Sequence, residues 1–374
     1  MFFKKFATFA LISFSLLVFA CESAEENVTE IVAPEDNTTE IAVEKEIVEK
    51  INVLATTPMI AEYVRQVGND NIDLNILMPY SADPHSFEAS PQDAKKIADA
   101  DLVFYVGLKY ESANLVELLE NSVSSEDILI EIGPSIDPIE FSEEGHEGHD
   151  DHEGHDDHEG HEGHEGHDHG IYDPHFWFDP IRVSMAVEVI KDELIKNDSA
   201  NESSYASAAA SFVSELEALD QNVVAMFETI PVENRKIITT HEALGYLEAK
   251  YEIEVLTTII PSLNSEDGIT PKSLRNAIEV IEKNKIEVMF LEAESSSQYS
   301  EVIEQETGIA LVSGLWVETL QENQSYVDWL ENNVTIIVNN LPTEVHDDHD
   351  HDHDHDDHDD DDDHDGHDHG KKDK

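Results

Sequence analysis

Short, continuous apolar runs separated by helical stretches dominate the chain from residue 51 onward and constrain its fold most. Such runs are typical of strands buried on both faces, because a half-exposed strand would alternate apolar and polar residues. Helix starts are marked between them, as at Ser90-Pro91 and Thr270-Pro271, where a capping residue precedes Pro. The predicted strands form two sets of four, 51–56, 74–77, 102–106 and 128–132 first, then 236–240, 255–260, 288–291 and 310–312.

The segment 199–228 lies between the two sets and contains neither Gly nor Pro. Its apolar residues recur at three- to four-residue spacing, as one helical face requires. We expect one helix of about 45 Å, at about 1.5 Å per residue; two shorter helices with a kink are the alternative. The predicted fold is α/β, with two Rossmann-like α/β lobes joined by one long rigid helix. The predicted boundaries are 51–198 for the N-terminal lobe, 199–229 for the linking helix and 230–341 for the C-terminal lobe.

The first 21 residues have the organisation of an export signal that ends in a lipidation site. Two lysines precede a fifteen-residue apolar stretch, which is shorter than the roughly 20 residues that span a bilayer. The residues that end in Cys21 resemble a prokaryotic lipoprotein cleavage box, in which the Cys takes a lipid and becomes the mature N-terminus. We predict a signal peptide at 1–20 and a flexible, acidic, lipid-anchored tether at 21–50. Plain secretion is the alternative, and either places the protein outside the cytoplasm.

Histidine is distributed very unevenly along the chain. Of the 21 histidines, nine lie in 140–170 and nine in 342–374, where they alternate mostly with acidic residues. Neither tract has enough apolar residues to offset the entropy of folding, so we expect both to be disordered without metal. Imidazole and carboxylate both bind Zn²⁺ and its neighbours, so the tracts are predicted to gather metal; a solvated acidic spacer is the alternative. The net charge of −63 excludes a nucleic-acid partner.

Only three histidines remain for the folded part: His85, His175 and His241. His85 and His241 follow predicted strands, where ligands of open α/β sheets collect. A metal held by all three would bridge the two lobes. A metalloprotease motif at His241 fails, because a second His is needed four residues later and position 245 is Gly. A zinc hydrolase with three His ligands and an open position stays as an alternative, with Glu242 as its candidate base.

Several segments resemble the metal-binding subunits of bacterial and archaeal zinc/manganese ABC importers. This resemblance implies a metal in the inter-lobe cleft, with His85, His175 and His241 as its ligands and Zn²⁺ as the transported ion. It also implies a monomer that catalyses no reaction, that delivers metal to an ABC permease and its ATPase, and that meets the membrane only through its N-terminal lipid. The matching segments are 82–85, 173–180, 239–246, 290–292, 305–308 and 325–330, with Asn333.

The resemblance also bears on which metal is bound and on its fourth ligand. A His at the third position goes with zinc in this family, whereas manganese members tend to carry a carboxylate there, so His241 favours zinc. For the fourth position, water is the first choice and Glu318 the second. Glu292 is expected to orient a ligand rather than to bind metal. A Mn²⁺ or Fe²⁺ binder, and a surface adhesin or metal-storage lipoprotein, stay as alternative functions.

Overall fold

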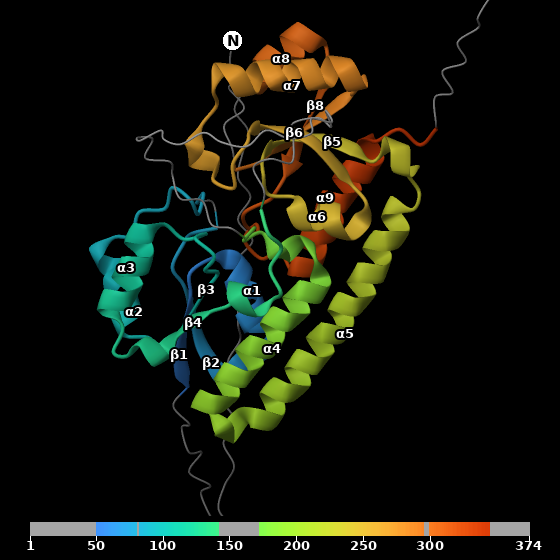
Figure 1. Ribbon diagram of the computed structural model, residues 1–374. Coiled ribbons are helices and arrows are strands. Elements are labelled where there is room, and N and C mark those ends of the chain that lie inside the picture. Colours follow the sequence, from blue (N-terminus) through green and yellow to red (C-terminus); the bar gives the residue numbers. More distant parts are fainter. Residues whose placement is uncertain (1–49, 81, 142–171, 295–298, 345–374) are drawn as a thin grey trace, which may run out of the picture. The chain divides into compact units, whose positions relative to one another are not determined.

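A four-stranded parallel sheet organises the first half of the chain (Figure 1). The computed structural model describes residues 50–80, 82–141, 172–294 and 299–344. The strand order is β2-β1-β3-β4, so the chain crosses over the sheet between strands, as parallel pairing requires. The strands are β1 (Ile51–Ala55), β2 (Ile72–Ile76), β3 (Leu102–Tyr105) and β4 (Leu129–Glu131).

Helices cover both faces of this sheet, which explains the continuous apolar strands. In β3, Phe104 packs on the face of the sheet that α1 (Pro58–Gly68) covers. The preceding residue, Val103, points to the other face and packs into a second hydrophobic cluster. That second cluster is completed by α2 (Pro91–Ala98) and α3 (Ala113–Ser122). Ser90 caps the start of α2 directly before Pro91, as the sequence predicted, and the Asp93 carboxylate completes a capping box by accepting from the main-chain N–H of Ser90 at 2.9 Å.

The second half contains two parallel strand pairs, β5 with β6 and β7 with β8. Apolar residues of these strands pack on one side against α7 and α8, in a small separate core, and on the other against the main core. All eight strands lie where the sequence placed them, to within three residues at each end. The elements are β5 (Lys236–His241), α6 (Gly245–Tyr251), β6 (Glu254–Ile260), α7 (Pro271–Asn284), β7 (Val288–Glu292), α8 (Ser300–Thr307), β8 (Ala310–Leu315) and α9 (Tyr326–Asn340).

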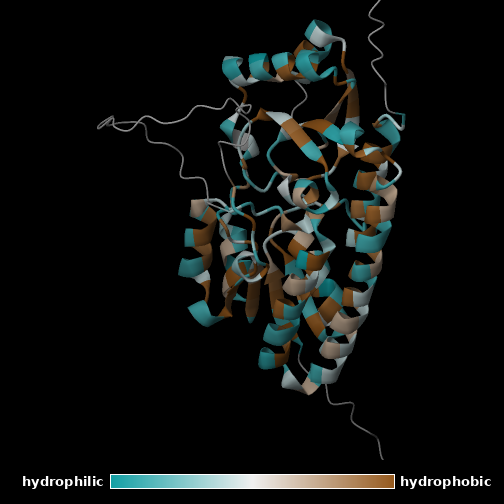
Figure 2. Cartoon of the chain, turned by 45° about the vertical axis from the view of Figure 1, so that its right-hand side comes forward, coloured by the Kyte–Doolittle hydropathy of each residue, from teal (hydrophilic) through white to brown (hydrophobic). Residues whose placement is uncertain are grey.

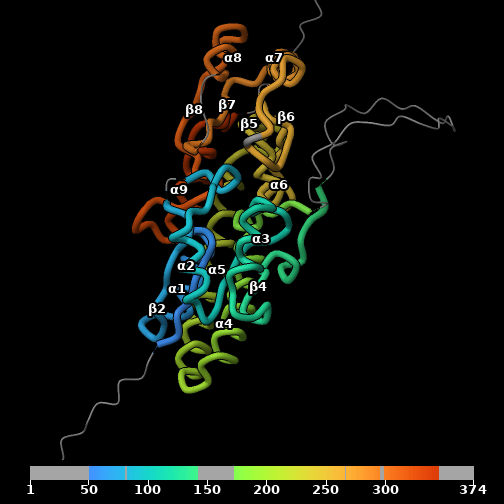
Figure 3. Tube along the Cα trace, turned by 90° about the vertical axis from the view of Figure 1, so that its left-hand side faces the viewer, coloured from blue at the N-terminus to red at the C-terminus, as the bar shows by residue number. Residues whose placement is uncertain are grey.

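Two long helices, α4 (Pro180–Asn197) and α5 (Glu202–Phe227), come between the two sets of strands in the sequence. They pack side by side (Figure 1). The 26 residues of α5 form one uninterrupted helix, about 39 Å long at 1.5 Å per residue. A short 3-10 turn, Ser199–Asn201, precedes it, so the helix begins three residues later than the sequence predicted. Figure 3 shows α5 beside the blue elements of the first half, and it also contacts α9 in the second. The prediction of two α/β lobes with a linking helix is confirmed.

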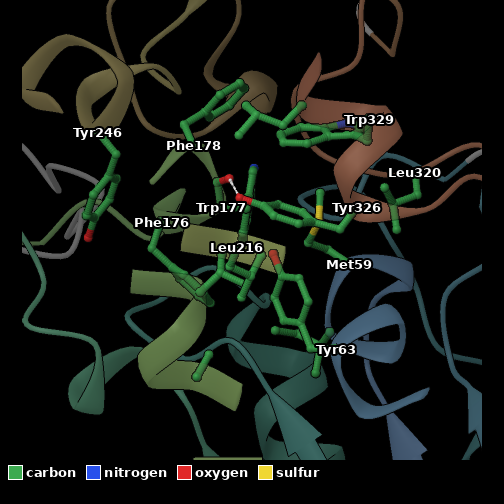
Figure 4. Close-up of a cluster of buried hydrophobic side chains, with 14 of the residues drawn as sticks. Met59, Tyr63, Phe176, Trp177, Phe178, Leu216, Tyr246, Leu320, Tyr326 and Trp329 are labelled. Carbon is green, nitrogen blue, oxygen red and sulfur yellow. Dashed lines mark hydrogen bonds between the residues drawn. The ribbon is translucent and has the colours of Figure 1, made fainter. Parts of the chain in front are cut away.

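One hydrophobic core extends through both halves, and hydrophilic residues lie along the outer faces of the helices (Figure 2). Its centre is aromatic: the hydroxyl of Tyr326 from α9 donates to the main-chain oxygen of Trp177 at 2.8 Å (Figure 4). Tyr63 of α1 packs edge-on against the Tyr326 ring. Because these residues come from both halves, the core resists separation of the lobes. Within the described residues, no helix has both the length and the apolar character to cross a bilayer.

Candidate metal centre

The fold brings together the three histidines that lie outside the tracts. His85 lies in the loop between β2 and α2, and His241 is the last residue of β5. His175 lies in the loop before α4, followed directly by the buried Phe176–Phe178 turn. Their imidazole rings are 5.5 to 6.1 Å apart between centroids. The site therefore lies at the carboxyl ends of strands from both halves, as expected for an α/β protein.

Glu318 is the fourth member of this cluster. Its Oε1 lies 3.5 Å from Nε2 of His85, 3.3 Å from Nε2 of His175 and 2.7 Å from Nε2 of His241. All four ligand atoms lie within 4.8 Å of one another, and the four side chains are at most 3% exposed. The sequence favoured water over Glu318 at the fourth position, whereas the structure brings the Glu318 carboxylate close to all three histidines.

The loop after β8 holds Glu318 in place through both main-chain and side-chain contacts. The carboxylate of Glu294 accepts from the main-chain N–H of Glu318 at 3.1 Å and of Thr319 at 3.3 Å. The indole N–H of Trp177 donates to the oxygen of Val317 at 2.7 Å. Each residue that flanks Glu318 is therefore held by a hydrogen bond to a side chain from another segment.

A carboxylate lies behind two of the histidines and fixes the orientation of each ring. Asp173 Oδ1 lies 2.7 Å from Nδ1 of His175, and Glu292 Oε2 lies 2.7 Å from Nδ1 of His241. Each carboxylate also accepts the main-chain N–H of the same His at 2.9 Å. Such contacts turn Nε2 toward the centre of the cluster and raise its basicity. The predicted orienting role of Glu292 is seen here in its contact with His241.

The charges of these groups are strongly coupled. Burial lowers the pKa of His175, but the carboxylates of Glu318 and Asp173 outweigh burial and raise it to about 9. Burial also lowers the pKa of His241, but the Glu292 carboxylate outweighs burial and raises it. The pKa of Glu318 is held well below its usual range, because His175 and His85 outweigh the effect of burial. In the absence of a cation, the cluster therefore favours protonated His175 and His241 around an ionised Glu318 carboxylate.

Four buried atoms at the centre, the three Nε2 atoms and Glu318 Oε1, face one another and have no hydrogen-bond partner outside the cluster among the described residues. Unsatisfied buried polar atoms are costly, and four that converge on one point need an occupant. Three imidazole nitrogens and one carboxylate oxygen form a ligand set that suits a divalent transition metal. This donor set, with its carboxylate supports, therefore has the chemistry of a cation site.

A pocket of about 820 Å³ adjoins the site, and of the four cluster residues only His85 lines it. The described carboxylates in its wall come from the β3–α3 region, from β4 and from the turn after β6. They give the approach to His85 a negative potential, which attracts cations. These residues are Glu111, Glu117, Glu120, Glu131 and Asp267.

Several predicted features lie outside the described residues, namely the 1–20 signal, Cys21, the tether, and most of both tracts. Close to the first tract, Glu140 and Tyr172 pair in an antiparallel bridge, three residues before His175. The sequence reasoning missed Asp173, Glu294 and Tyr110, whose hydroxyl donates to Glu318 Oε2 at 2.9 Å. Only Asp173 had a usable signal, because Asp two residues before His forms a local turn that bonds the His main-chain N–H.

Comparison with known proteins places this chain in a family. The family model for zinc-uptake complex component A, periplasmic, matches residues 53–340. A metal ABC transporter substrate-binding lipoprotein of Streptococcus cristatus is 25% identical over 78% of this chain and 89% of its own. A manganese ABC transporter substrate-binding lipoprotein of Streptococcus anginosus is 24% identical over 78% and 90%.

Solved structures show the same fold. The periplasmic zinc-binding protein TroA of Treponema pallidum has a TM-score of 0.66 at 20% identity, covering 78% of this chain and 99% of its own. The Fe(III)-bound YtgA of Chlamydia trachomatis has a TM-score of 0.65 at 24% identity, covering 79% and 100%. Because the family model matches most of the chain, this protein belongs to the zinc-uptake complex component A family, a family of metal-uptake binding components and not of enzymes.

Proposed function

We propose that this protein binds Zn²⁺ outside the cytoplasm through His85, His175, His241 and Glu318, and delivers it to an ABC permease that works with an ATPase. One observation carries the proposal: four buried, convergent ligand atoms that have no hydrogen-bond partner outside their own cluster among the described residues. The family membership supports the uptake role. The choice of zinc rests on three nitrogen ligands, which suit Zn²⁺ better than Mn²⁺.

His241→Ala tests the site directly. In wild-type protein, one Zn²⁺ per chain should survive competition with a strong chelator, whereas the tracts should lose theirs. The variant should lose that tight ion and keep the weaker tract binding, which serves as the internal control. Equal tight binding by both proteins would contradict the proposed site.

Mn²⁺ or Fe²⁺ is the second candidate cargo. Glu318 adds an oxygen ligand that these metals accept readily, and several relatives are described as manganese transporter components. Direct competition between Zn²⁺ and Mn²⁺ decides between them. The readout is the metal that the wild-type protein retains and the His241→Ala variant loses. Tighter Mn²⁺ binding would replace zinc in the proposal.

The terminal segments belong to the same proposal. Residues 1–20 would direct export, Cys21 would carry the lipid, and the monomer would stay tethered to the membrane by that lipid. The tract at 145–169 would gather zinc near the site; its neighbours Glu140 and Tyr172 meet three residues from His175. Deleting 145–169 should reduce zinc uptake at limiting zinc, and unchanged uptake would refute this role. Loss of uptake on gene deletion separates transport from adhesion or storage.

A further inference from the structure

The two carboxylate oxygens of Glu318 have different surroundings. Oε1 lies 2.7 to 3.5 Å from the three imidazole Nε2 atoms and has no hydrogen-bond partner outside the cluster among the described residues. Oε2 accepts a hydrogen bond of 2.9 Å from the hydroxyl of Tyr110, which also lies 3.3 Å from the main-chain oxygen of Glu318. One oxygen therefore points at the metal position, and the other already has a donor.

Tyr110 is part of the wall of the site. Its ring meets those of His85 at 5.1 Å, His175 at 5.9 Å and Trp177 at 5.2 Å, all edge-on, and the side chain is 1% exposed. A buried hydroxyl without a hydrogen-bond partner destabilises the folded protein, so the bond to Glu318 stabilises this position of Tyr110. Burial and the Glu318 carboxylate raise the pKa of Tyr110 well above its usual value, which keeps the hydroxyl a donor.

We propose, building on the function proposed above, that Tyr110 determines metal specificity by occupying Glu318 Oε2, so that Glu318 offers the metal a single oxygen. Three imidazoles and one oxygen make a four-coordinate set, the preference of Zn²⁺. A carboxylate that bound through both oxygens would raise the coordination number and the oxygen content. Mn²⁺ gains more from that change than Zn²⁺ does. Tyr110 is thus a positioning residue that disfavours manganese.

The backbone directly before Tyr110 is strained. Gly107, Leu108 and Lys109 all have positive φ values, of 77°, 53° and 66°. Two successive non-glycine residues in this region are costly, and such strain persists only where surrounding contacts impose it. The buried carboxylate of Glu111 holds the start of this turn, because it accepts hydrogen bonds from the N–H groups of Val106 at 2.8 Å and Gly107 at 2.9 Å. This turn delivers the Tyr110 hydroxyl from one lobe to Glu318 of the other.

Tyr110→Phe tests the proposal, because it removes one oxygen atom and keeps the ring. We expect the ratio of the Mn²⁺ and Zn²⁺ dissociation constants to fall about tenfold or more, the range in which outer-shell partners act. The full chain is used, so that both proteins carry the same tracts. Tyr63→Phe is the matched control: Tyr63 is fully buried, but its hydroxyl has no hydrogen-bond partner among the described residues, so the ratio should not change.

Co²⁺ serves as the spectroscopic probe, because four-coordinate Co²⁺ absorbs visible light more strongly than five- or six-coordinate Co²⁺. Subtracting the spectrum of Co²⁺-treated His241→Ala removes the contribution of the tracts. Wild type should then give the intense four-coordinate spectrum and Tyr110→Phe a weaker one. A higher coordination number in wild type overturns the proposal whether or not the variant folds.

An equal loss of Zn²⁺ and Mn²⁺ affinity in Tyr110→Phe, with an unchanged Co²⁺ spectrum, would also overturn it. In that case Tyr110 supports the site without selecting the metal. Failure of the function proposed above gives a different result, since His241→Ala would then leave tight metal binding intact.

Discussion

The tripeptide Asp-Pro-His occurs twice at the site, at residues 83–85 and 173–175, and the structure uses the two copies differently. In both, the aspartate Oδ1 accepts the main-chain N–H of the histidine at 2.9 Å. Asp173 Oδ1 also contacts the imidazole Nδ1 of its own His175 at 2.7 Å. Asp83 instead directs its second oxygen to the hydroxyl of Ser265, in the other lobe, at 2.8 Å.

This difference separates a fixed ligand from one that depends on the arrangement of the lobes. His175 is fully buried and its ring is held within its own segment. His85 lines the acidic pocket, and its segment is tied to the second lobe through Ser265. We therefore expect His175 to be preformed for metal, and the position of His85 to respond when the lobes move.

The largest expected effect is the pH dependence of a preformed His175. Its pKa of about 9 in the metal-free protein means that metal must displace a proton below that pH. Release of that one proton should raise Zn²⁺ affinity by up to about tenfold per pH unit from pH 7.5, with a shallower rise as the pH nears 9. The His241→Ala variant carries the same tracts, so the difference between the two proteins in competition titrations reports the site. A flat affinity would contradict the coupling of His175 to Asp173 and Glu318.

The stability of the metal-free protein should change in the opposite direction over the same range. The folded pKa of His175 exceeds its unfolded value of about 6.5, so its contribution is complete below about pH 6.5 and is lost as pH rises through about 9. Glu294, with a folded pKa raised to about 8, adds a loss of the same sign starting at lower pH. Thermal unfolding of chelator-treated protein measures this trend, and saturating Zn²⁺ should reverse it.

Asp173→Ala should have the next largest effect. Removing the carboxylate frees the His175 ring and lowers its basicity, and such outer-shell losses reduce metal affinity about 10- to 100-fold. Asp83→Ala is the natural control, because that carboxylate has a similar main-chain bond but directs its second oxygen to Ser265. Equal losses in the two variants would show that the ring contact has no special weight.

Gly245→Ala should lower metal affinity in the same direction as Asp173→Ala, because a side chain at residue 245 would displace the Asp173 carboxylate. A Cβ at Gly245, the first residue of α6, would lie 2.5 Å from Asp173 Oδ2, so the carboxylate would have to rotate away. We expect about a tenfold loss of affinity. In an Asp173→Ala background the same change should cost nothing more, because the clashing group is absent. Gly308→Ala, with φ of 74° and no neighbour within 4 Å, should lower stability but not affinity.

These contacts also show where sequence reasoning ends. The strands could be predicted because continuous apolar runs reflect burial on both faces, and the three histidines because no others remain outside the tracts. Of the groups around them, the family resemblance pointed only to Glu292, as an orienting carboxylate, and to Glu318, as second choice for the fourth position. Among 84 acidic residues, nothing local distinguishes Glu294. Tyr110 and Glu318 are 208 residues apart, and only the packing of two lobes makes them neighbours.

The smallest expected effect comes from Ser265→Ala, which cuts the link between Asp83 and the second lobe. A single partly buried hydrogen bond contributes about 1 kcal/mol, so the free energy of unfolding should fall by no more than that. Zn²⁺ affinity should fall less than threefold, about 0.6 kcal/mol, because Asp83 keeps its bond to the His85 main chain. The loss should appear mainly as faster Zn²⁺ release in stopped-flow chelation, since His85 would be held less firmly relative to the second lobe. If Ser265→Ala instead matched Asp173→Ala in affinity, the two segments would be equivalent, and His85 would need its lobe contact as much as His175 needs its carboxylate.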